Sequence, residues 1–187
     1  MQNEKCLFVV SGPAGVGKDS VVKTMRDAHP EIEKTVSATT RKPRPGEQEG
    51  ISYYYRSVDE FKHMLKNGDI LESNFYCGNY YGTPRAEVEK RLSEGKIVVL
   101  IIDVHGAANL KHLYPDSTTV FICPPSVEEL EARLRGRGTE DEETIANRMI
   151  TARSELALAS TYDVRIVNDE LNACAEQLYQ LICQRAQ

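Results

Sequence analysis

The sequence predicts an α/β fold: a three-layer parallel sheet with helices on both faces, interrupted by a small inserted α+β subdomain and a short lid. Three observations predict it. Residues 97–102 are uniformly apolar and residues 118–123 are β-branched or apolar, which is typical of strands that are covered on both faces. Strand and helix signals alternate along the chain. A glycine-rich loop within residues 11–20 joins the first strand to the first helix.

The individual elements follow from local signals taken in chain order. Apolar, β-branched runs indicate strands, and hydroxyl or carboxylate caps mark where helices begin. Strands are expected at residues 5–10, 35–37, 53–55, 69–76, 97–102, 118–123 and 164–167. Helices are expected at residues 18–28, 57–67, 83–94, 126–135, 139–159 and 171–186. Gly78-Asn79 is expected to form a turn, and Pro84 to take the first position of its helix.

The segment from Ser11 to Ser20 carries the most informative local motif. Gly12, Gly17 and Lys18 fit the G-x-x-x-x-G-K spacing of a phosphate-binding loop (P-loop). Glycines let backbone N–H groups turn inward, and the following helix adds the positive end of its dipole. Lys18 would supply a mobile charge for the β and γ phosphates of ATP. The residues expected to bind ATP here are Gly12, Pro13, Ala14, Gly15, Val16, Gly17, Lys18, Asp19 and Ser20.

Length and composition favour one compact domain that spans residues 1–187. The formal net charge is −5, so a nucleic-acid partner is not expected. Basic residues gather only locally, at 41–44 and 133–137, which suits a small anionic ligand. The five cysteines lack metal-site spacing and read as reduced thiols of a cytoplasmic protein. The apolar run near the start is too short for a signal peptide, and no membrane span is expected.

A second motif identifies a family. Residues 39–55, with Thr39-Thr40, Glu47 and Gly50, resemble the signature segment of guanylate kinases. Further segments that resemble the family are 78–82, 135–139 and 167–169, and the resemblance runs from about residue 6 to residue 170. It implies transfer of a phosphoryl group from ATP to GMP or dGMP, which yields ADP and GDP or dGDP in purine nucleotide metabolism.

The resemblance also implies a binding site for GMP. The implied ligands of its phosphate are Arg41, Arg44, Tyr53 and Tyr81. Glu72 is the implied guanine reader, helped by Ser37, Thr83 and Asp103. An ionised carboxylate only accepts hydrogen bonds, and guanine offers adjacent donors at N1 and at its amino group. Adenine presents an acceptor at N1, so Glu72 would reject it.

The family's lid arginines match Arg137 and Arg148, which would close over the phosphates and exclude water. The implied catalytic residues are Lys18, Arg41, Arg137 and Arg148. Asn168 would contact the adenine end of ATP or cap a turn. Arg133 and Arg135 are weaker candidates for the lid, because salt bridges to Glu129 or Glu131 along a helix would explain them equally well. The implied division is a core of residues 1–34 and 91–187, a GMP-binding subdomain of residues 35–90, and a lid at about 136–145.

Three positions depart from the family pattern. Asp19 replaces the hydroxyl that usually follows the loop lysine, Ile101 replaces an aspartate, and His105 replaces a glutamine. A carboxylate about 4 Å from a phosphate charge is repelled by about 4 kcal/mol at an effective dielectric constant of about 20. We therefore expect Asp19 to bind Mg²⁺, directly or through water, with a carboxylate gained at 19 in place of the one lost at 101.

Two other functions remain open at this stage. Ribose 1,5-bisphosphate phosphokinases resemble guanylate kinases and can also read Gly-Lys-Asp-Ser at this loop. Catalytically inactive guanylate-kinase-like domains serve as protein-binding modules, although they typically lose the loop lysine and the lid arginines. The oligomeric state is left as monomer or homodimer.

Overall fold

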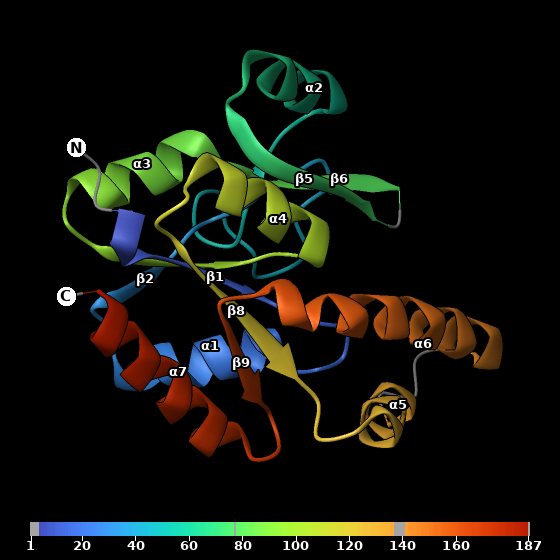
Figure 1. Cartoon of the computed structure of the whole chain (residues 1–187). Helices are drawn as coiled ribbons and strands as arrows, with labels where there is room; N and C mark the ends of the chain where they lie inside the picture. Colours follow the sequence, from blue (N-terminus) through green and yellow to red (C-terminus); the bar gives the residue numbers. More distant parts are fainter. Residues whose placement is uncertain (1–3, 77, 137–140, 187) are drawn as a thin grey trace.

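A computed structural model describes residues 4–76, 78–136 and 141–186 (Figure 1). The strands are β1 (Leu7–Ser11), β2 (Ile32–Lys34), β3 (Ala38–Thr39), β4 (Tyr54–Tyr55), β5 (Ile70–Tyr76), β6 (Asn79–Pro84), β7 (Ile97–Ile101), β8 (Thr118–Cys123) and β9 (Val164–Val167). The α-helices are α1 (Lys18–Ala28), α2 (Val58–Asn67), α3 (Arg85–Ser93), α4 (Val104–Leu113), α5 (Val127–Arg135), α6 (Glu142–Ala157) and α7 (Leu171–Arg185). Short 3₁₀ helices lie at Glu4–Cys6 and Leu158–Thr161.

A parallel five-stranded sheet, in the order β2-β7-β1-β8-β9, forms the middle of three layers (Figure 1). Every residue of β1 is buried, as expected for a central strand that is covered on both faces. On one face, Met25 of α1 and Leu178 of α7 pack in the same cluster as Phe8. On the other face, Leu110 of α4 packs in a cluster with Val9. The predicted three-layer α/β fold is confirmed.

A second, mixed sheet in the order β4-β3-β6-β5 stands beside the first (Figure 1). Its own small core is formed by Ala38, Phe61 of α2 and Ile70. Leu71, the next residue of β5, is instead buried in the cluster that contains Leu110 of α4. Alternation along β5 therefore gives one side chain to the small core and the next to the large one, which fixes the small sheet against α4.

The strand expected at residues 35–37 is wrong. β2 ends at Lys34, and β3 begins at Ala38 in the other sheet. Ile32 pairs with Ile97 in the parallel sheet, whereas Ala38 pairs with Tyr54 and Gly82 in the mixed one. Residues 35–37 thus form a crossing between two sheets, in which the carbonyl of Ser37 accepts from the N–H of Tyr54 at 2.9 Å but no regular ladder forms.

Two boundaries between Gly78 and Pro84 differ from the expectation. The expected turn is present at Gly78, but Asn79 already belongs to β6 (Asn79–Pro84), which runs antiparallel to β5, and Pro84, expected as the first residue of a helix, ends that strand. Pro84 has extended backbone and is the N-cap of α3. In addition, α4 was not expected; Asp103 caps it by accepting from the N–H of Gly106 at 2.8 Å.

The helix caps explain the remaining boundaries. Ser57 and Glu60 form the expected reciprocal capping box of α2, and Ser126 accepts from the N–H of Glu129 at 3.0 Å in α5. α6 was expected to begin at Thr139, which lies outside the described residues. In the described part, Asp141 caps this helix by accepting from the N–H of Thr144 at 2.8 Å.

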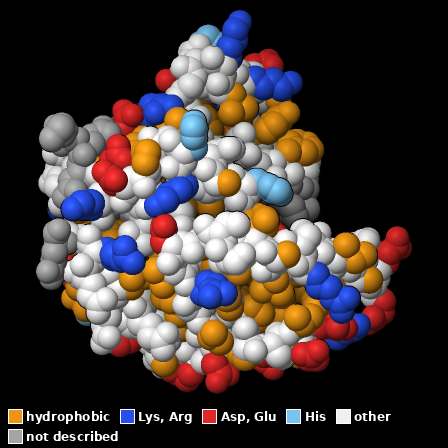
Figure 2. All heavy atoms as spheres, in the orientation of Figure 1, with side chains coloured by type: hydrophobic (Ala, Val, Ile, Leu, Met, Phe, Trp, Pro, Cys, Tyr) orange, Lys and Arg blue, Asp and Glu red, His pale blue; other side chains and the backbone are white. Residues whose placement is uncertain are grey.

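The molecular surface shows charges of both signs interspersed on the face drawn in Figure 2. No broad patch of a single sign covers that face, in keeping with the modest net charge of −5. Among the helices that the structure describes, none has the length and apolar character needed to cross a bilayer.

Asp163 ties β9 to the sheet and generates a prediction about stability. Its Oδ2 accepts from the N–H and hydroxyl of Thr119, both at 2.8 Å, and from Nζ of Lys111 at 3.0 Å. Burial alone would raise the pKa of Asp163, but these hydrogen bonds hold it below its ordinary value. We expect Asp163→Asn to lower the free energy of unfolding by about 1–2 kcal/mol near neutral pH, measured by urea unfolding.

This difference should shrink with acid. A carboxyl whose pKa is lowered by folding contributes stability above its unfolded value, and that contribution is lost below pH about 4. Asp116→Asn, at an exposed position before β8, is the matched control. Equal losses in the two variants at every pH would contradict the role given to Asp163.

Candidate active site

The loop between β1 and α1 holds a lysine at the start of a helix. Gly12 has a φ of +143°, and a Cβ there would lie 2.4 Å from the carbonyl oxygen of Ile122, so only glycine fits. Gly17, with a φ of 95°, is the N-cap of α1. Nζ of Lys18 donates to the carbonyl oxygens of Gly12 at 2.5 Å and of Pro13 at 3.1 Å. The loop thus gathers positive charge at a helix N-terminus, where an anion is favoured.

Asn168 supports this loop from behind. Its buried side-chain amide donates to the carbonyl oxygen of Val16 at 2.7 Å. Its backbone N–H donates to the carbonyl of Cys123 at 2.8 Å, and its own carbonyl accepts from Arg133 at 3.0 Å. Asn168 therefore links the ends of β8 and β9 to the phosphate loop, a contact that the sequence reading did not anticipate.

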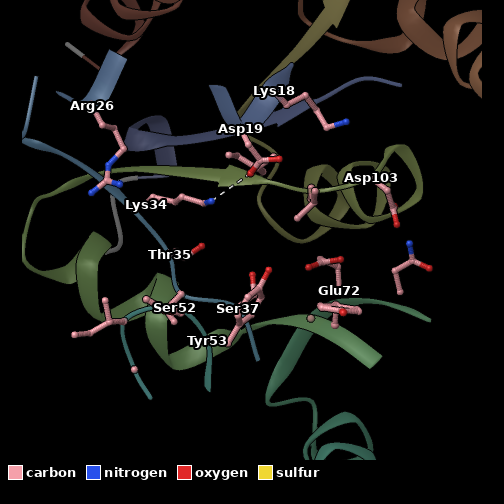
Figure 3. Close-up of a pocket in the computed structure, with 18 residues that line it drawn as sticks. Lys18, Asp19, Arg26, Lys34, Thr35, Ser37, Ser52, Tyr53, Glu72 and Asp103 are labelled. Atoms are coloured by element: carbon pink, nitrogen blue, oxygen red, sulfur yellow. Dashed lines mark hydrogen bonds and ion pairs between the residues drawn. The ribbon is translucent and has the colours of Figure 1, made fainter. Parts of the chain in front are cut away.

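A cleft of about 780 Å³ lies between the two sheets (Figure 3). One wall comes from the start of α1 and the end of β7, where Ile101 is exposed to the cleft. The facing wall comes from β5, β6 and the segment before β4. The cleft brings together these predicted site residues: Lys18, Asp19, Ser37, Tyr53, Glu72, Tyr81 and Asp103.

The other residues expected to bind GMP do not line this cleft directly. Arg41 lies over the ring of Tyr53, with Cζ 5.4 Å from the ring centroid, and so borders the cleft. Thr83 is buried behind Glu72. Arg44 is exposed on the surface. Its backbone N–H donates to the carboxylate of Glu47, which also binds Arg41.

Glu47 holds Arg41 in a fixed orientation. The Nη1 and Nη2 atoms of Arg41 donate to the two carboxylate oxygens of Glu47 at 3.0 and 2.8 Å. The same carboxylate accepts from the N–H of Arg44 at 2.8 Å and from the hydroxyl of Tyr55 at 2.9 Å. Arg41 chiefly, and then these other donors, lower the pKa of Glu47 to about 2. A bidentate fork of this kind orients the guanidinium plane before any ligand arrives.

Glu72 is the most perturbed acid of the cleft. Its side chain is 9% exposed, and Oε1 accepts from the hydroxyl of Thr83 at 2.6 Å. Burial chiefly raises the pKa of Glu72, hydrogen bonds from Thr83 oppose the rise and the nearby carboxylate of Asp103 adds to it, so that the pKa is about 7. Glu72 is therefore about half ionised at neutral pH. Because its surroundings supply few donors, it favours a ligand that brings donors of its own.

Gly106 makes room for this carboxylate. A Cβ at Gly106 would lie 2.8 Å from Oε2 of Glu72, so any larger residue would push the acid from its place. The N–H of Gly106 also donates to Asp103. The sequence reading picked out neither Gly106 nor the orienting role of Glu47. Only the spacing of Glu47 from Arg41 and Arg44 within the signature segment could have indicated the orienting role of Glu47.

Asp19 enters the same cleft from the first turn of α1 (Figure 3). Its side chain is 81% exposed, and Oδ1 lies 3.5 Å from Nζ of Lys34. Burial raises the pKa of Tyr53, and the carboxylate of Asp19 adds to that rise, so Asp19 also faces the tyrosines of the opposite wall. An accessible carboxylate beside a phosphate loop is a donor that suits a hard divalent cation.

The predicted lid is only partly described. Arg137 lies outside the described residues, as do residues 138–140. Arg148 is on α6 and is half-buried. Arg133 pairs with Glu129 at 3.0 Å and Arg135 with Glu131 at 2.8 Å, so the alternative reading of these two arginines as helix-face ion pairs is correct.

Comparisons with known proteins agree with this geometry. Residues 4–185 match the guanylate kinase family. The chain is 49% identical over 176 residues to the guanylate kinase of Gloeobacter violaceus, with 94% of this chain and 86% of that protein covered. It is 47% identical over 182 residues to the guanylate kinase of Lactococcus lactis subsp. lactis, covering 97% and 89%. A crystal structure of guanylate kinase from Anaplasma phagocytophilum superposes with a TM-score of 0.73 at 31% identity, covering 97% and 86%.

The Thr83 hydroxyl generates a prediction that needs no ligand. Thr83→Val removes the 2.6 Å hydrogen bond that stabilises the charged form of Glu72, so the pKa of Glu72 should rise above about 7. Carboxyl carbon NMR titration of the isolated protein measures this change directly. Thr144→Val on α6, remote from the cleft, is the control. A pKa that is unchanged or lower in Thr83→Val would show that this hydrogen bond does not hold the charge.

Proposed function

The chain belongs to the guanylate kinase family, and we propose that its cleft transfers the γ-phosphoryl group of ATP to GMP, yielding ADP and GDP. One observation carries the proposal. A single cleft has the lysine of a phosphate loop at one side and a buried, donor-poor carboxylate at the other. These are the two sites that a phosphoryl transfer from ATP to a guanine nucleotide needs. We extend the proposal to dGMP as a second acceptor. We also propose that the protein works in the cytoplasm.

We assign the phosphate of GMP to the wall that carries Arg41, Arg44, Tyr53 and Tyr81. Arg41 is already oriented by Glu47, so it loses little freedom when it meets a dianion. The rings of Tyr53 and Tyr81 lie edge to face with centroids 6.1 Å apart, which keeps two hydroxyl donors near each other. Arg44 would move from the surface as its loop closes.

We assign the guanine base to Glu72, with Ser37, Thr83 and Asp103 beside it. The N1–H and amino group of guanine would give Glu72 the donors that its pocket lacks, and they stabilise its ionised form. Adenine would bring an acceptor at N1 instead. Thr83 would contribute mainly by orienting Glu72, because its hydroxyl donates to that carboxylate.

On the donor side, the loop backbone and Lys18 would bind the β and γ phosphates. The assigned residues are Gly12, Pro13, Ala14, Gly15, Val16, Gly17, Lys18, Asp19 and Ser20, with Asn168 toward the adenine end. Nζ of Lys18 would leave the carbonyls of Gly12 and Pro13 to reach a phosphate. Arg148, together with Arg137 from the lid at about 136–145, would stabilise charge on the transferred group.

We further propose that Asp19 is the protein ligand of Mg²⁺. Its carboxylate is accessible in the cleft and faces the wall that would hold the acceptor phosphate. A cation there would relieve the repulsion between this carboxylate and the phosphates. An ion held by Asp19 would neutralise phosphate charge during the transfer. Lys34 would give up its ion pair with Asp19. Residues 35–90 would then form the GMP-binding subdomain, with residues 1–34 and 91–187 as the core.

The two alternative functions fit less well. Relatives at 47–49% identity over nearly the whole chain carry the name guanylate kinase, which favours GMP over a ribose bisphosphate as acceptor. An inactive binding module would have no use for Lys18 held in an intact phosphate loop. Whether the enzyme works as a monomer or a homodimer is outside this proposal.

Glu72 provides the test of substrate choice. With ATP and each nucleoside monophosphate in turn, the wild type should turn over GMP and reject AMP. Glu72→Gln should lose about 10- to 100-fold in kcat/KM for GMP, because one guanine donor would face an amide donor and a charged hydrogen bond is lost. A variant that still prefers GMP over AMP as strongly as the wild type would overturn the assignment.

The pKa of Glu72 adds a prediction about pH. Because guanine needs the ionised acid and its pKa is about 7 in the empty cleft, KM for GMP should rise about tenfold between high pH and pH about 6. The phosphate of GMP also titrates near pH about 6, so the profile of Glu72→Gln serves as the reference. Identical profiles for the two proteins would argue against this titration.

Asp19 is tested by titrating magnesium in the same assay. Asp19→Ser should raise the Mg²⁺ concentration for half-maximal rate about tenfold and lower turnover, because a charged ligand becomes a neutral one. Asp27→Ser, an exposed aspartate on the same helix, should leave both unchanged. An unaltered magnesium titration in Asp19→Ser would remove Asp19 from the metal site.

A further inference from the structure

Four polar side chains from three elements are joined in a line outside the cleft. The hydroxyl of Tyr54, on β4, donates to Oε1 of Glu87, on α3, at 2.6 Å. Arg91, further along α3, pairs with the other carboxylate oxygen of Glu87 and donates to its backbone carbonyl at 3.1 Å. Nε of Arg91 also forms an ion pair with Oε2 of Glu33, on β2, at 3.0 Å. The line thus runs from the mixed sheet through α3 to the parallel sheet, and the proposed chemistry leaves it unused.

The middle of this line is shielded from water. The side chains of Glu87 and Arg91 are 14% and 18% exposed. Ion pairs at such positions are screened less by salt than pairs on an open surface, and the planar guanidinium fixes the direction of its contacts. α3 is itself held against the parallel sheet, because Val88 is buried in the cluster that contains Val98 of β7. These contacts are therefore suited to hold β4 at a fixed distance from β2.

Each end of the line lies next to a residue of the cleft. Tyr54 follows Tyr53, and Glu33 precedes Lys34; both Tyr53 and Lys34 line the cleft (Figure 3). Side chains of neighbouring residues in an extended chain point to opposite faces, so one member of each pair turns to the cleft and the other to α3. Contacts made outside the cleft thus fix Tyr53, on one wall, relative to Lys34, on the other.

The order of the mixed sheet explains why β4 needs this support. In the order β4-β3-β6-β5, β4 lies at the edge opposite β5, and β5 is the strand that Leu71 fixes against α4. The chain connects this sheet to the rest of the molecule through residues 35–37 and through Pro84, and short segments between packed elements can act as hinges. The line of four side chains holds the edge that the packing of β5 does not reach.

We propose that Tyr54, Glu87, Arg91 and Glu33 form a brace that sets the separation of the two cleft walls, with Glu87 as the positioning residue at its centre. The inference rests on the proposed binding of GMP in this cleft and names residues outside the cleft that position its acceptor site. Because Tyr53 is assigned to the phosphate of GMP, its distance from the phosphate loop decides how the reacting groups align. A wall that is held in place before GMP arrives also loses less freedom when GMP binds.

The test is calorimetric binding of GMP, and separately of ADP, to the full-length protein without magnesium. Tyr54→Phe removes only the hydroxyl and should weaken GMP binding about fivefold, because the wall must then be ordered by the ligand. ADP binding should stay unchanged, because the brace does not include the phosphate loop. Glu33→Val, which keeps a residue suited to a strand, should cause the same selective loss. Lys96→Gln is the matched control and should equal wild type, since Lys96 pairs with Glu33 at 3.5 Å outside the brace.

A double variant separates a brace from two independent contacts. Once the brace is broken at one end, the other end no longer holds the wall, so Tyr54→Phe added to Glu33→Val should weaken GMP binding no further. Steady-state rates give a second readout. In each single variant kcat at saturating GMP should fall several-fold, because the bound acceptor is less well aligned with the donor. A network that only stabilises the fold would leave kcat unchanged.

Unchanged or tighter GMP binding by Tyr54→Phe, with the variant shown to be folded by its circular dichroism, would overturn the inference. Equal losses of affinity for GMP and ADP, additive losses in the double variant, or an unchanged kcat would also overturn it. Failure of the wild type itself to bind GMP would instead overturn the proposed function.

Discussion

The cleft is organised around a carboxylate that the fold buries without giving it a cation. Glu72 receives one side-chain hydroxyl, from Thr83, and faces a second acid, Asp103. Gly106 leaves the space that this carboxylate fills. Because a buried acid with few donors is poorly satisfied, its pKa rises to about 7, and the site gains most from a ligand that supplies donors. In the proposed assignment, selectivity for guanine would be a consequence of burial rather than of one specific contact.

The cations of the cleft follow the reverse principle, because they are held in place before the substrate arrives. Glu47 fixes the fork of Arg41, and carbonyls of the phosphate loop hold Lys18. Asn168 in turn supports that loop. Phosphoryl transfer depends mostly on positioning and on charge stabilisation, so prior orientation of these groups lowers the cost of assembling the reactants. The exposed carboxylate of Asp19 lies in the same cleft as Lys18 and pairs with Lys34.

Much of this could be predicted from the sequence. The phosphate loop, the parallel strands and the signature segment have strong local patterns, because buried strands must be apolar and a P-loop needs glycine where Gly12 meets Ile122. Long-range pairing could not be predicted. Residues 35–37 look like a strand, but they cross between two sheets. Pro84 looks like the start of a helix, but it ends β6. Its place in a strand depends on pairing with β5, which the local sequence does not reveal.

The central claim is that guanine ionises Glu72 when it binds, and isothermal titration calorimetry of GMP in buffers of different ionisation enthalpy measures it most directly. Near neutral pH, where Glu72 is half protonated in the empty cleft, about half a proton should be released for each GMP bound. Glu72→Gln should lose this release and keep only the smaller one from the GMP phosphate, which titrates near pH about 6. Wild type that releases no more protons on binding GMP than Glu72→Gln does would contradict the account.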